Sequence, residues 1–255
     1  MSLVIDLSGK TALVTGASQG IGAAIARTLH HAGTRVILNC PDLEGRVAQR
    51  DAEALASELR SRRADSAFVR VADISDPQAV ETMMRSIQAD FGGLDILVNN
   101  AGILRDRSIM KMTLEEWQAV LDVNLSGVFH GCKFGLEILH DGGSIVNIGS
   151  LSAKAGFHGQ SNYAAAKAGV HALTRVLSRE CARRGIRVNA VAPGVIETPM
   201  TAHLPDLVRT EMIRNISSQR FGTVDEVAHA VLFLCSPMAS YVNGHVLEVN
   251  GGWVG

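Results

Sequence analysis

Short runs of aliphatic and β-branched residues alternate with longer stretches of helical spacing along almost the whole chain. The apolar runs predict seven strands, at residues 11–14, 36–38, 67–71, 95–98, 144–148, 186–192 and 245–249. Helices are expected at residues 21–31, 44–62, about 113–139 and about 162–183, and two more start near residues 77 and 223. Because the strands lack polar alternation and helices separate them, they should form a parallel sheet covered on both faces.

Three of these helices begin with a capping signal. Ser75 or Asp76 can cap the helix whose first turn Pro77 suits, and Thr113 and Thr223 are each followed by Glu three residues later. No repeat or linker divides the 255 residues, so the pattern predicts an α/β fold, with one doubly wound domain over residues 1–255. Residues 193–222 have no strong strand signal, and we expect them to form a substrate loop.

Composition excludes several classes of function. Lys and Arg total 24 against 25 Asp and Glu, which leaves no basic field to attract nucleic acid. No apolar stretch approaches the roughly 20 residues of a membrane helix, and no signal peptide is visible. Cys40, Cys132, Cys181 and Cys235 are widely spaced and form no metal-binding pattern. We therefore expect a cytoplasmic protein with buried, reduced thiols, no metal site and no membrane contact.

A glycine-rich turn joins the first predicted strand to the first helix. Residues 15–22 read Thr-Gly-Ala-Ser-Gln-Gly-Ile-Gly, so the glycines have the spacing Gly-x-x-x-Gly-x-Gly. Glycine permits close backbone approach, and the start of a helix presents free N–H groups, which together suit a pyrophosphate. A tight turn that serves only packing is the alternative. The predicted cofactor contacts here are Gly16, Ser18, Gln19, Gly20, Ile21 and Gly22.

Other candidate cofactor contacts follow the carboxyl ends of later strands, where ligands bind in open α/β sheets. They are Asp73 and Ile74 after the third strand, Asn100, Ala101 and Gly102 after the fourth, and Pro193 and Gly194 after the sixth. The Asp73 carboxylate could accept from an adenine amine. Asp and Asn at strand ends are also ordinary turn residues, but their joint placement favours a Rossmann-type nucleotide site.

Tyr163 and Lys167 form the most reactive candidate pair, because i and i+4 share one face of a helix. A fixed cation and a nicotinamide charge near the phenol would favour phenolate, so we expect a lowered pKa for Tyr163. Ser150, at the end of the fifth strand, could stabilise a developing alkoxide. Asn124 could hold a water that relays protons from Lys167. The alternatives are a surface Tyr, a solvated Lys and an ordinary Asn hydrogen bond between helices.

In this order the motifs resemble those of short-chain dehydrogenases/reductases, from Lys10 to Gly252. The resemblance implies Tyr163 as acid/base, Ser150 as substrate orienter, Lys167 as holder of the nicotinamide ribose and Asn124 in a proton relay. It also adds Ile196 and Thr198 to the cofactor site and Gln160 to the substrate site, next to Ser150 and Tyr163. Hydride transfer at a nicotinamide and a homotetramer are implied as well. A nucleotide-binding regulatory protein is the non-enzyme alternative, but it would be expected to lack one of Ser150, Tyr163 or Lys167.

Within this family the pattern is similar to 3-oxoacyl-[acyl-carrier-protein] reductases, notably at residues 99–106, 159–163 and 220–222. The resemblance implies an acyl-thioester substrate and acyl carrier protein as a partner. Those reductases usually carry basic residues just before the serine strand, whereas residues 140–144 hold no Lys or Arg, which leaves Arg183 and Arg184 as a basic contact. An NAD-dependent dehydrogenase of a small secondary alcohol, sugar or cyclic ketone therefore stays open.

The cofactor is expected to be NAD(H) or NADP(H). Relatives that use NADP usually place Arg or Lys in the glycine turn or after the second strand, to meet the 2′-phosphate. Here those places hold Gln19 and the segment Asn-Cys-Pro at residues 39–41. Asp42 follows, and its carboxylate would accept from ribose hydroxyls and repel a phosphate. These residues favour NAD(H).

Overall fold

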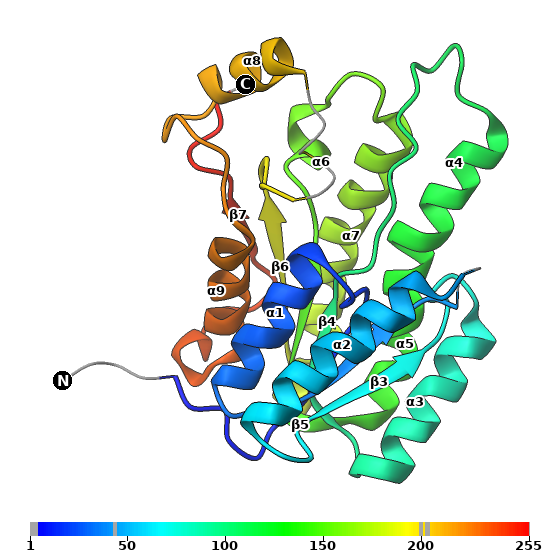
Figure 1. The fold of residues 1–255 in the computed structure, drawn as a ribbon, viewed down its shortest axis with the longest axis vertical. Coiled ribbons are helices and arrows are strands. Elements are labelled where there is room, and N and C mark those ends of the chain that lie inside the picture. The colour runs from blue at the N-terminus through cyan, green and yellow to red at the C-terminus, as the bar shows by residue number, and fades with distance from the viewer. Residues whose placement is uncertain (1–4, 43–44, 199–200, 202–204, 255) are drawn as a thin grey trace.

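A seven-stranded parallel sheet forms the centre of the computed structural model, which describes residues 5–42, 45–198, 201 and 205–254 (Figure 1). The strands are β1 (Thr11–Val14), β2 (Arg35–Cys40), β3 (Ala67–Val71), β4 (Leu94–Asn99), β5 (Leu139–Ile148), β6 (Arg187–Pro193) and β7 (Val246–Val249). Their order is β3-β2-β1-β4-β5-β6-β7, and every neighbouring pair is parallel. This confirms the doubly wound α/β prediction.

Helices cover both faces of the sheet and enclose two hydrophobic cores. One core packs under α1 (Gly20–His31), α2 (Val47–Arg62) and α9 (Val224–Cys235). The other packs under α3 (Pro77–Phe91), α5 (Gly127–Ile138) and α7 (Ser161–Glu180). The carboxyl ends of the strands point toward α6 (Ser152–Ala155), α8 (Asp206–Arg214) and the start of α4 (Leu114–Leu121) (Figure 1).

The capping signals in the sequence are used as predicted. The Asp76 carboxylate accepts from the Gln78 N–H at the start of α3, with Pro77 in the first turn. Thr113 and Thr223 form complete capping boxes with Glu116 and Glu226, at the starts of α4 and α9. These side chains satisfy N–H groups that have no partner within the helix, so each start is fixed by local chemistry.

The long helix expected at residues 113–139 is interrupted. After α4, residues Asp122–Ser126 form a π-helical segment, and α5 continues from Gly127. A π segment shifts the side chains that follow it relative to a regular helix, and such segments often occur at functional sites. Asn124 lies inside this one and is fully buried.

Other boundaries also differ from the predictions. The helix expected at residues 44–62 begins at Val47, because Arg46 before it has a φ of 51°, in the left-handed region. The helix expected at 162–183 ends at Glu180, and a short 3₁₀ turn follows at Ala182–Arg184. The short helices α6 and α8 were not predicted. Within the proposed substrate loop, 193–222, residues 199–200 and 202–204 lie outside the described residues.

Over the described residues, no helix is long and apolar enough to cross a membrane. Nor do three or more His, Cys, Asp or Glu side chains gather there in a way that could hold a metal ion. All four cysteines are buried and unpaired, as predicted.

Candidate active site

The glycine turn between β1 and α1 is shaped by close backbone contacts. Gly16 has a φ of 61°, and a Cβ on it would lie 2.7 Å from the Ala101 Cα. A Cβ on Gly22 would lie 2.3 Å from the Gly16 oxygen. Gly20 has a φ of 56°, but no atom lies within 4 Å of the place where its Cβ would be. The turn is therefore packed on its inner side and open beside Gly20, which fits a pyrophosphate at the N-terminus of α1.

The turn is tied to the end of β4 by a reciprocal set of hydrogen bonds. The Thr15 hydroxyl accepts from the backbone N–H groups of Asn100, at 2.9 Å, and Ala101, at 3.1 Å. The Asn100 amide in turn donates to the carbonyl oxygens of Thr15, at 2.9 Å, and Gly16, at 3.0 Å. The two candidate cofactor motifs, which lie 85 positions apart in the sequence, are therefore held together by hydrogen bonds.

The adenosine side of the candidate cofactor site lies at the ends of β2 and β3. The Asn39 amide donates to the Ala72 carbonyl at 3.0 Å, which joins these two ends. Asp42 is exposed. Asp73 is exposed too, and its Oδ1 accepts from the Ser75 N–H and hydroxyl, which leaves its Oδ2 for a ligand. Ile74 is buried beside it.

The segment after β6 completes the edge of the sheet. The Gly194 N–H donates to the Val249 carbonyl at 2.9 Å, and a Cβ on Gly194 would lie 2.7 Å from the Asn250 Cα. The Pro193 carbonyl accepts from the Leu151 N–H at 2.9 Å, which ties this segment to the residue after Ser150. Ile196 is buried, and Thr198 lies next to the turn residues Ser18 and Gln19 in one groove.

Ser150, Tyr163 and Lys167 meet at the same edge. Ser150 directly follows β5 and is 9 % exposed, and the two others lie on α7. Lys167 is 3 % exposed, its Nζ donates to the Ile148 carbonyl at 2.8 Å, and that Nζ lies 5.7 Å from the centroid of the Tyr163 ring. Lys167 of the predicted i, i+4 pair is thus buried against the serine strand, which rules out a solvated Lys, while Tyr163 is half-buried.

The protonation states differ in part from the expectation. Burial raises the pKa of Tyr163, contact with Ser150 opposes this, and the Asp106 carboxylate adds to it. In the protein alone, desolvation of the phenolate is the largest effect on this pKa, and the lowering expected from Lys167 together with a nicotinamide charge stays a prediction for the cofactor-bound enzyme. Burial lowers the pKa of Lys167 from 10.5 to about 8.

Asn124 is engaged at both ends of its amide. Its Oδ1 accepts from the Ile103 N–H at 2.8 Å, and its Nδ2 donates to the Ile103 carbonyl at 2.9 Å. A Cβ on Gly102 would lie 3.2 Å from the Asn124 Oδ1 and 3.7 Å from the Lys167 Nζ. These bonds run to the loop after β4 and not between helices, and one N–H and one lone pair of the amide remain for a water near Lys167.

Gln160 extends the site toward solvent through two residues that sequence reasoning missed. The Ser152 hydroxyl donates to the Gln160 Oε1 at 2.8 Å, and the Gln160 Nε2 donates to the Asp106 Oδ2 at 2.9 Å. Asp106 ends the stretch at residues 99–106 that carries the resemblance, but it was given no role there, and Ser152 lies in none of the motifs. Only the fold brings the loop after β4 against the loop before α7.

Known proteins are similar to this chain over almost its whole length. The family profile described as Enoyl-(Acyl carrier protein) reductase matches residues 16–254. The 3-oxoacyl-[acyl-carrier-protein] reductases FabG of Vibrio cholerae and Escherichia coli are each 43 % identical over 250 residues, which cover 97 % of this chain and 98 % of theirs. A short-chain dehydrogenase/reductase of Brucella melitensis, titled glucose/ribitol dehydrogenase, has a TM-score of 0.91 at 36 % identity, with 98 % of both chains covered. The chain belongs to the short-chain dehydrogenase/reductase family.

A solved structure from a metagenomic library extends the match. That blue fluorescent protein, in complex with NADPH, has a TM-score of 0.92 at 35 % identity, over 98 % of this chain and 100 % of its own. This short-chain dehydrogenase/reductase is thus an oxidoreductase that uses a nicotinamide cofactor and acts on carbonyl or secondary alcohol groups. The fit at Gly20 and the gathering of Ser150, Tyr163 and Lys167 agree with that activity.

Proposed function

We propose that this enzyme reduces a 3-oxoacyl thioester, carried by acyl carrier protein, to the 3-hydroxyacyl thioester. The observation that carries the substrate class is the 43 % identity to reductases named for that reaction, over nearly the full length of both chains. The structure supports it with a site where a phenol, a hydroxyl and a buried ammonium meet beside the glycine turn. The roles of the individual residues below are part of the proposal.

Tyr163 is the proton donor to the substrate oxygen, and Ser150 donates a hydrogen bond to the same oxygen as charge develops on it. A bound reduced nicotinamide would supply the hydride to the carbonyl carbon. Lys167 holds the nicotinamide ribose and supplies positive charge that favours the Tyr163 phenolate left after proton transfer. Asn124 holds the loop at Ile103 and a water through which that phenolate is reprotonated.

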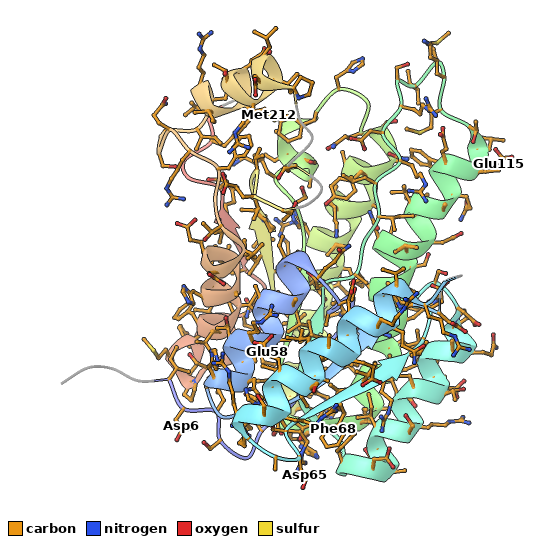
Figure 2. All side chains as sticks on the ribbon, in the orientation of Figure 1. Asp6, Glu58, Asp65, Phe68, Glu115 and Met212 are labelled. Carbon is orange, nitrogen blue, oxygen red and sulfur yellow. The ribbon has the colours of Figure 1, made fainter. Side chains whose placement is uncertain are left out.

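Exposed apolar side chains at the open edge suit an acyl chain. Ile109 and Met110 are 70 % and 91 % exposed in the loop before α4, Leu114 is 82 % exposed at its start, and Leu207 on α8 is 86 % exposed. Figure 2 shows that Glu115 on α4 and Met212 on α8 lie at this same end of the molecule, on opposite sides. Apolar groups on both sides can hold an aliphatic chain as it enters.

We propose that the basic contact with a carrier lies at this edge rather than at Arg183 and Arg184. Arg184 donates to Asp141 at 2.8 Å, near the start of β5, and this pair leaves it little net charge. At about 3.3 Å per residue, Asp141 lies roughly 20–30 Å along the strand from Ser150. Arg105 and Lys111, both exposed in the loop before α4, make no ion pair with any other described residue. We propose that they receive the acidic carrier.

A paired assay tests substrate and docking together. The enzyme should oxidise the reduced cofactor, read at 340 nm, with both acetoacetyl coenzyme A and acetoacetyl-acyl carrier protein. The double variant Arg105→Glu, Lys111→Glu should raise KM for the carrier-bound substrate about tenfold, because rim charges act on encounter. KM for acetoacetyl coenzyme A serves as the control and should change less than twofold. An equal rise in KM for both substrates would contradict the docking proposal. If neither substrate is turned over, the proposal of a thioester substrate is wrong.

One observation favours a second candidate function. The neutralised Arg184 and the absence of Lys or Arg at residues 140–144 differ from the basic pattern expected of carrier-protein reductases. An NAD-dependent dehydrogenase of a small secondary alcohol, sugar or cyclic ketone needs no such contact. Turnover of cyclohexanol with NAD⁺, in the absence of any thioester activity, would establish it.

We propose NAD(H) as the preferred cofactor. A groove of about 550 Å³ beside Ser18 and Gln19 is bordered by the carboxylates Asp51, Glu58, Glu197 and Asp225. Its one basic side chain among the described residues, Arg27, is held by Glu58 at 2.8 Å. Asp42 adds a further exposed carboxylate after β2. This acidic border disfavours a doubly charged 2′-phosphate, and Gln19 offers no cation in compensation.

A single added cation at position 19 should weaken the preference for NAD(H) over NADP(H). Fluorescence titration should give a Kd for NADH at least tenfold below that for NADPH. Gln19→Arg should lower the Kd for NADPH about tenfold, the scale of about 1.4 kcal/mol expected of one charge-assisted hydrogen bond. The matched variant Gln19→Leu should leave it unchanged. Tighter binding of NADPH by the unaltered enzyme would contradict the proposal and would point to Arg46 and Arg50, which follow Asp42 along the chain.

We also propose that the protein forms a homotetramer and lies in the cytoplasm. Phe129 on α5 and Val176 on α7 are 48 % and 52 % exposed on helices of one layer, and covering them suits further copies of this chain in a homotetramer. Four free, buried thiols suit the reducing cytoplasm.

A further inference from the structure

A chain of hydrogen bonds runs from Ser150 to an exposed carboxylate. The Ser150 hydroxyl donates to the Ser152 Oγ at 3.1 Å, and the Ser152 hydroxyl donates to the Gln160 Oε1 at 2.8 Å. The Gln160 Nε2 then donates to the Asp106 Oδ2 at 2.9 Å. Ser150 and Ser152 are 9 % and 5 % exposed, so water does not readily replace the bond between them, whereas the Gln160–Asp106 bond lies at the exposed end of the chain. Ser152 also gives its backbone N–H to the Ser150 Oγ at 3.0 Å.

The direction of this chain follows from its last member. An ionised carboxylate only accepts, so the Gln160 amide must turn its Nε2 toward Asp106 and its Oε1 toward Ser152. The Ser152 hydroxyl must then donate to Gln160, which leaves its oxygen as an acceptor for Ser150. The Ser150 proton is thereby directed at Ser152, away from a substrate. Hydroxyls and amides can take either orientation, so the charge on Asp106 decides it.

We propose that Asp106 and Ser152 are positioning residues that, through Gln160, set the direction in which the Ser150 hydroxyl donates. This inference rests on the proposed role of Ser150 in orienting a substrate oxygen. Without substrate, the Ser150 hydroxyl donates to Ser152, so a substrate carbonyl that binds must replace Ser152 as the acceptor. The charge of Asp106 at the edge of the site, acting through Gln160 and Ser152, thus controls how strongly Ser150 binds the ketone.

Reversing the chain is the test. In Asp106→Asn the new amide can donate, so Gln160 can turn over, Ser152 can donate to Ser150, and the Ser150 proton is free for substrate. We expect the KM for acetoacetyl coenzyme A to fall 3- to 10-fold, the range of one net hydrogen bond. In a Ser152→Ala background, Asp106→Asn should leave KM unchanged, because the link is cut. In a Ser152→Thr background, which keeps the hydroxyl, the 3- to 10-fold fall should return.

The controls separate this effect from others. Asp106 also acts on Tyr163 through space, so KM is measured on the plateau of the pH profile, and the shift of the alkaline limb, where Tyr163 loses its proton, should be the same in all backgrounds. The Kd for NADH should stay within twofold, which reports a folded site. If acetoacetyl coenzyme A is not reduced, cyclohexanone takes its place.

Three results would overturn the inference. The first is that Asp106→Asn changes KM equally with Ser152 intact and in the Ser152→Ala background. The second is that it changes KM in neither, and the third is that it raises KM. A separate variant, Ser150→Ala, tests the proposed function beneath it. If Ser150→Ala keeps full turnover, the role of Ser150 is wrong and the inference falls with it. If Ser150→Ala loses turnover while Asp106→Asn acts equally in both backgrounds, only the inference is wrong.

Discussion

Tyr163→Phe is expected to lower kcat at least 100-fold, since general acid catalysis of this kind contributes about 10²- to 10⁴-fold. The substitution removes one oxygen and keeps the ring that packs 5.7 Å from the Lys167 Nζ, so the fold should not change. The Kd for the reduced cofactor should stay within about twofold. Stopped-flow absorbance at 340 nm, with the ketone saturating, measures the chemical step directly.

The pH profile gives this prediction a second test. Burial raises the pKa of Tyr163 in the protein alone, so the phenol is protonated at neutral pH and ready to donate in the direction of reduction. Reduction should therefore fall as pH rises through that pKa, and the residual rate of Tyr163→Phe should lack this limb. A residual rate within tenfold of the unaltered enzyme would mean that another group donates the proton.

The parts that could be predicted from the sequence are those with local or periodic causes. Buried parallel strands require continuous apolar runs, and helix starts such as Thr113 and Thr223 carry their own caps, so both are readable. The glycine turn is readable for the same reason. Gly16 and Gly22 leave no room for a side chain, and that requirement is met by residue type at fixed spacing.

The parts that could not be predicted depend on contacts between distant segments. The π segment around Asn124 has no local signature, because the same residues would also fit a regular helix. The pair Ser152 and Asp106 is joined only when the loop after β4 reaches Gln160. The raised pKa of Tyr163 in the protein alone could not be predicted, because a sequence shows the neighbouring cation, whereas the desolvation that raises the pKa depends on packing.

Lys167→Met should lower turnover at least 100-fold and yet stabilise the protein. The Lys167 ammonium is 3 % exposed, and its burial lowers the pKa from 10.5 to about 8, which corresponds to about 3 kcal/mol at about 1.36 kcal/mol per unit. Methionine fills similar space without a charge. It also loses the bond to the Ile148 carbonyl, worth about 1 kcal/mol, so the net gain at pH 7 should be about 2 kcal/mol.

The pH dependence of that gain distinguishes a charge effect from a packing effect. Below pH 8, Lys167 is protonated in the folded and unfolded states, so its desolvation cost is fully present. Between pH 8 and 10.5 the folded state loses the proton first, so the stability of the unaltered enzyme rises with pH and the advantage of Met shrinks. Urea midpoints at pH 7 and pH 10, at one protein concentration, should show the gain at pH 7 only. An equal shift at both pH values would assign the effect to packing, whereas a loss of stability at pH 7 would mean that the ammonium is stabilised within the fold. The expected pattern places Lys167 among residues retained for catalysis at the expense of stability.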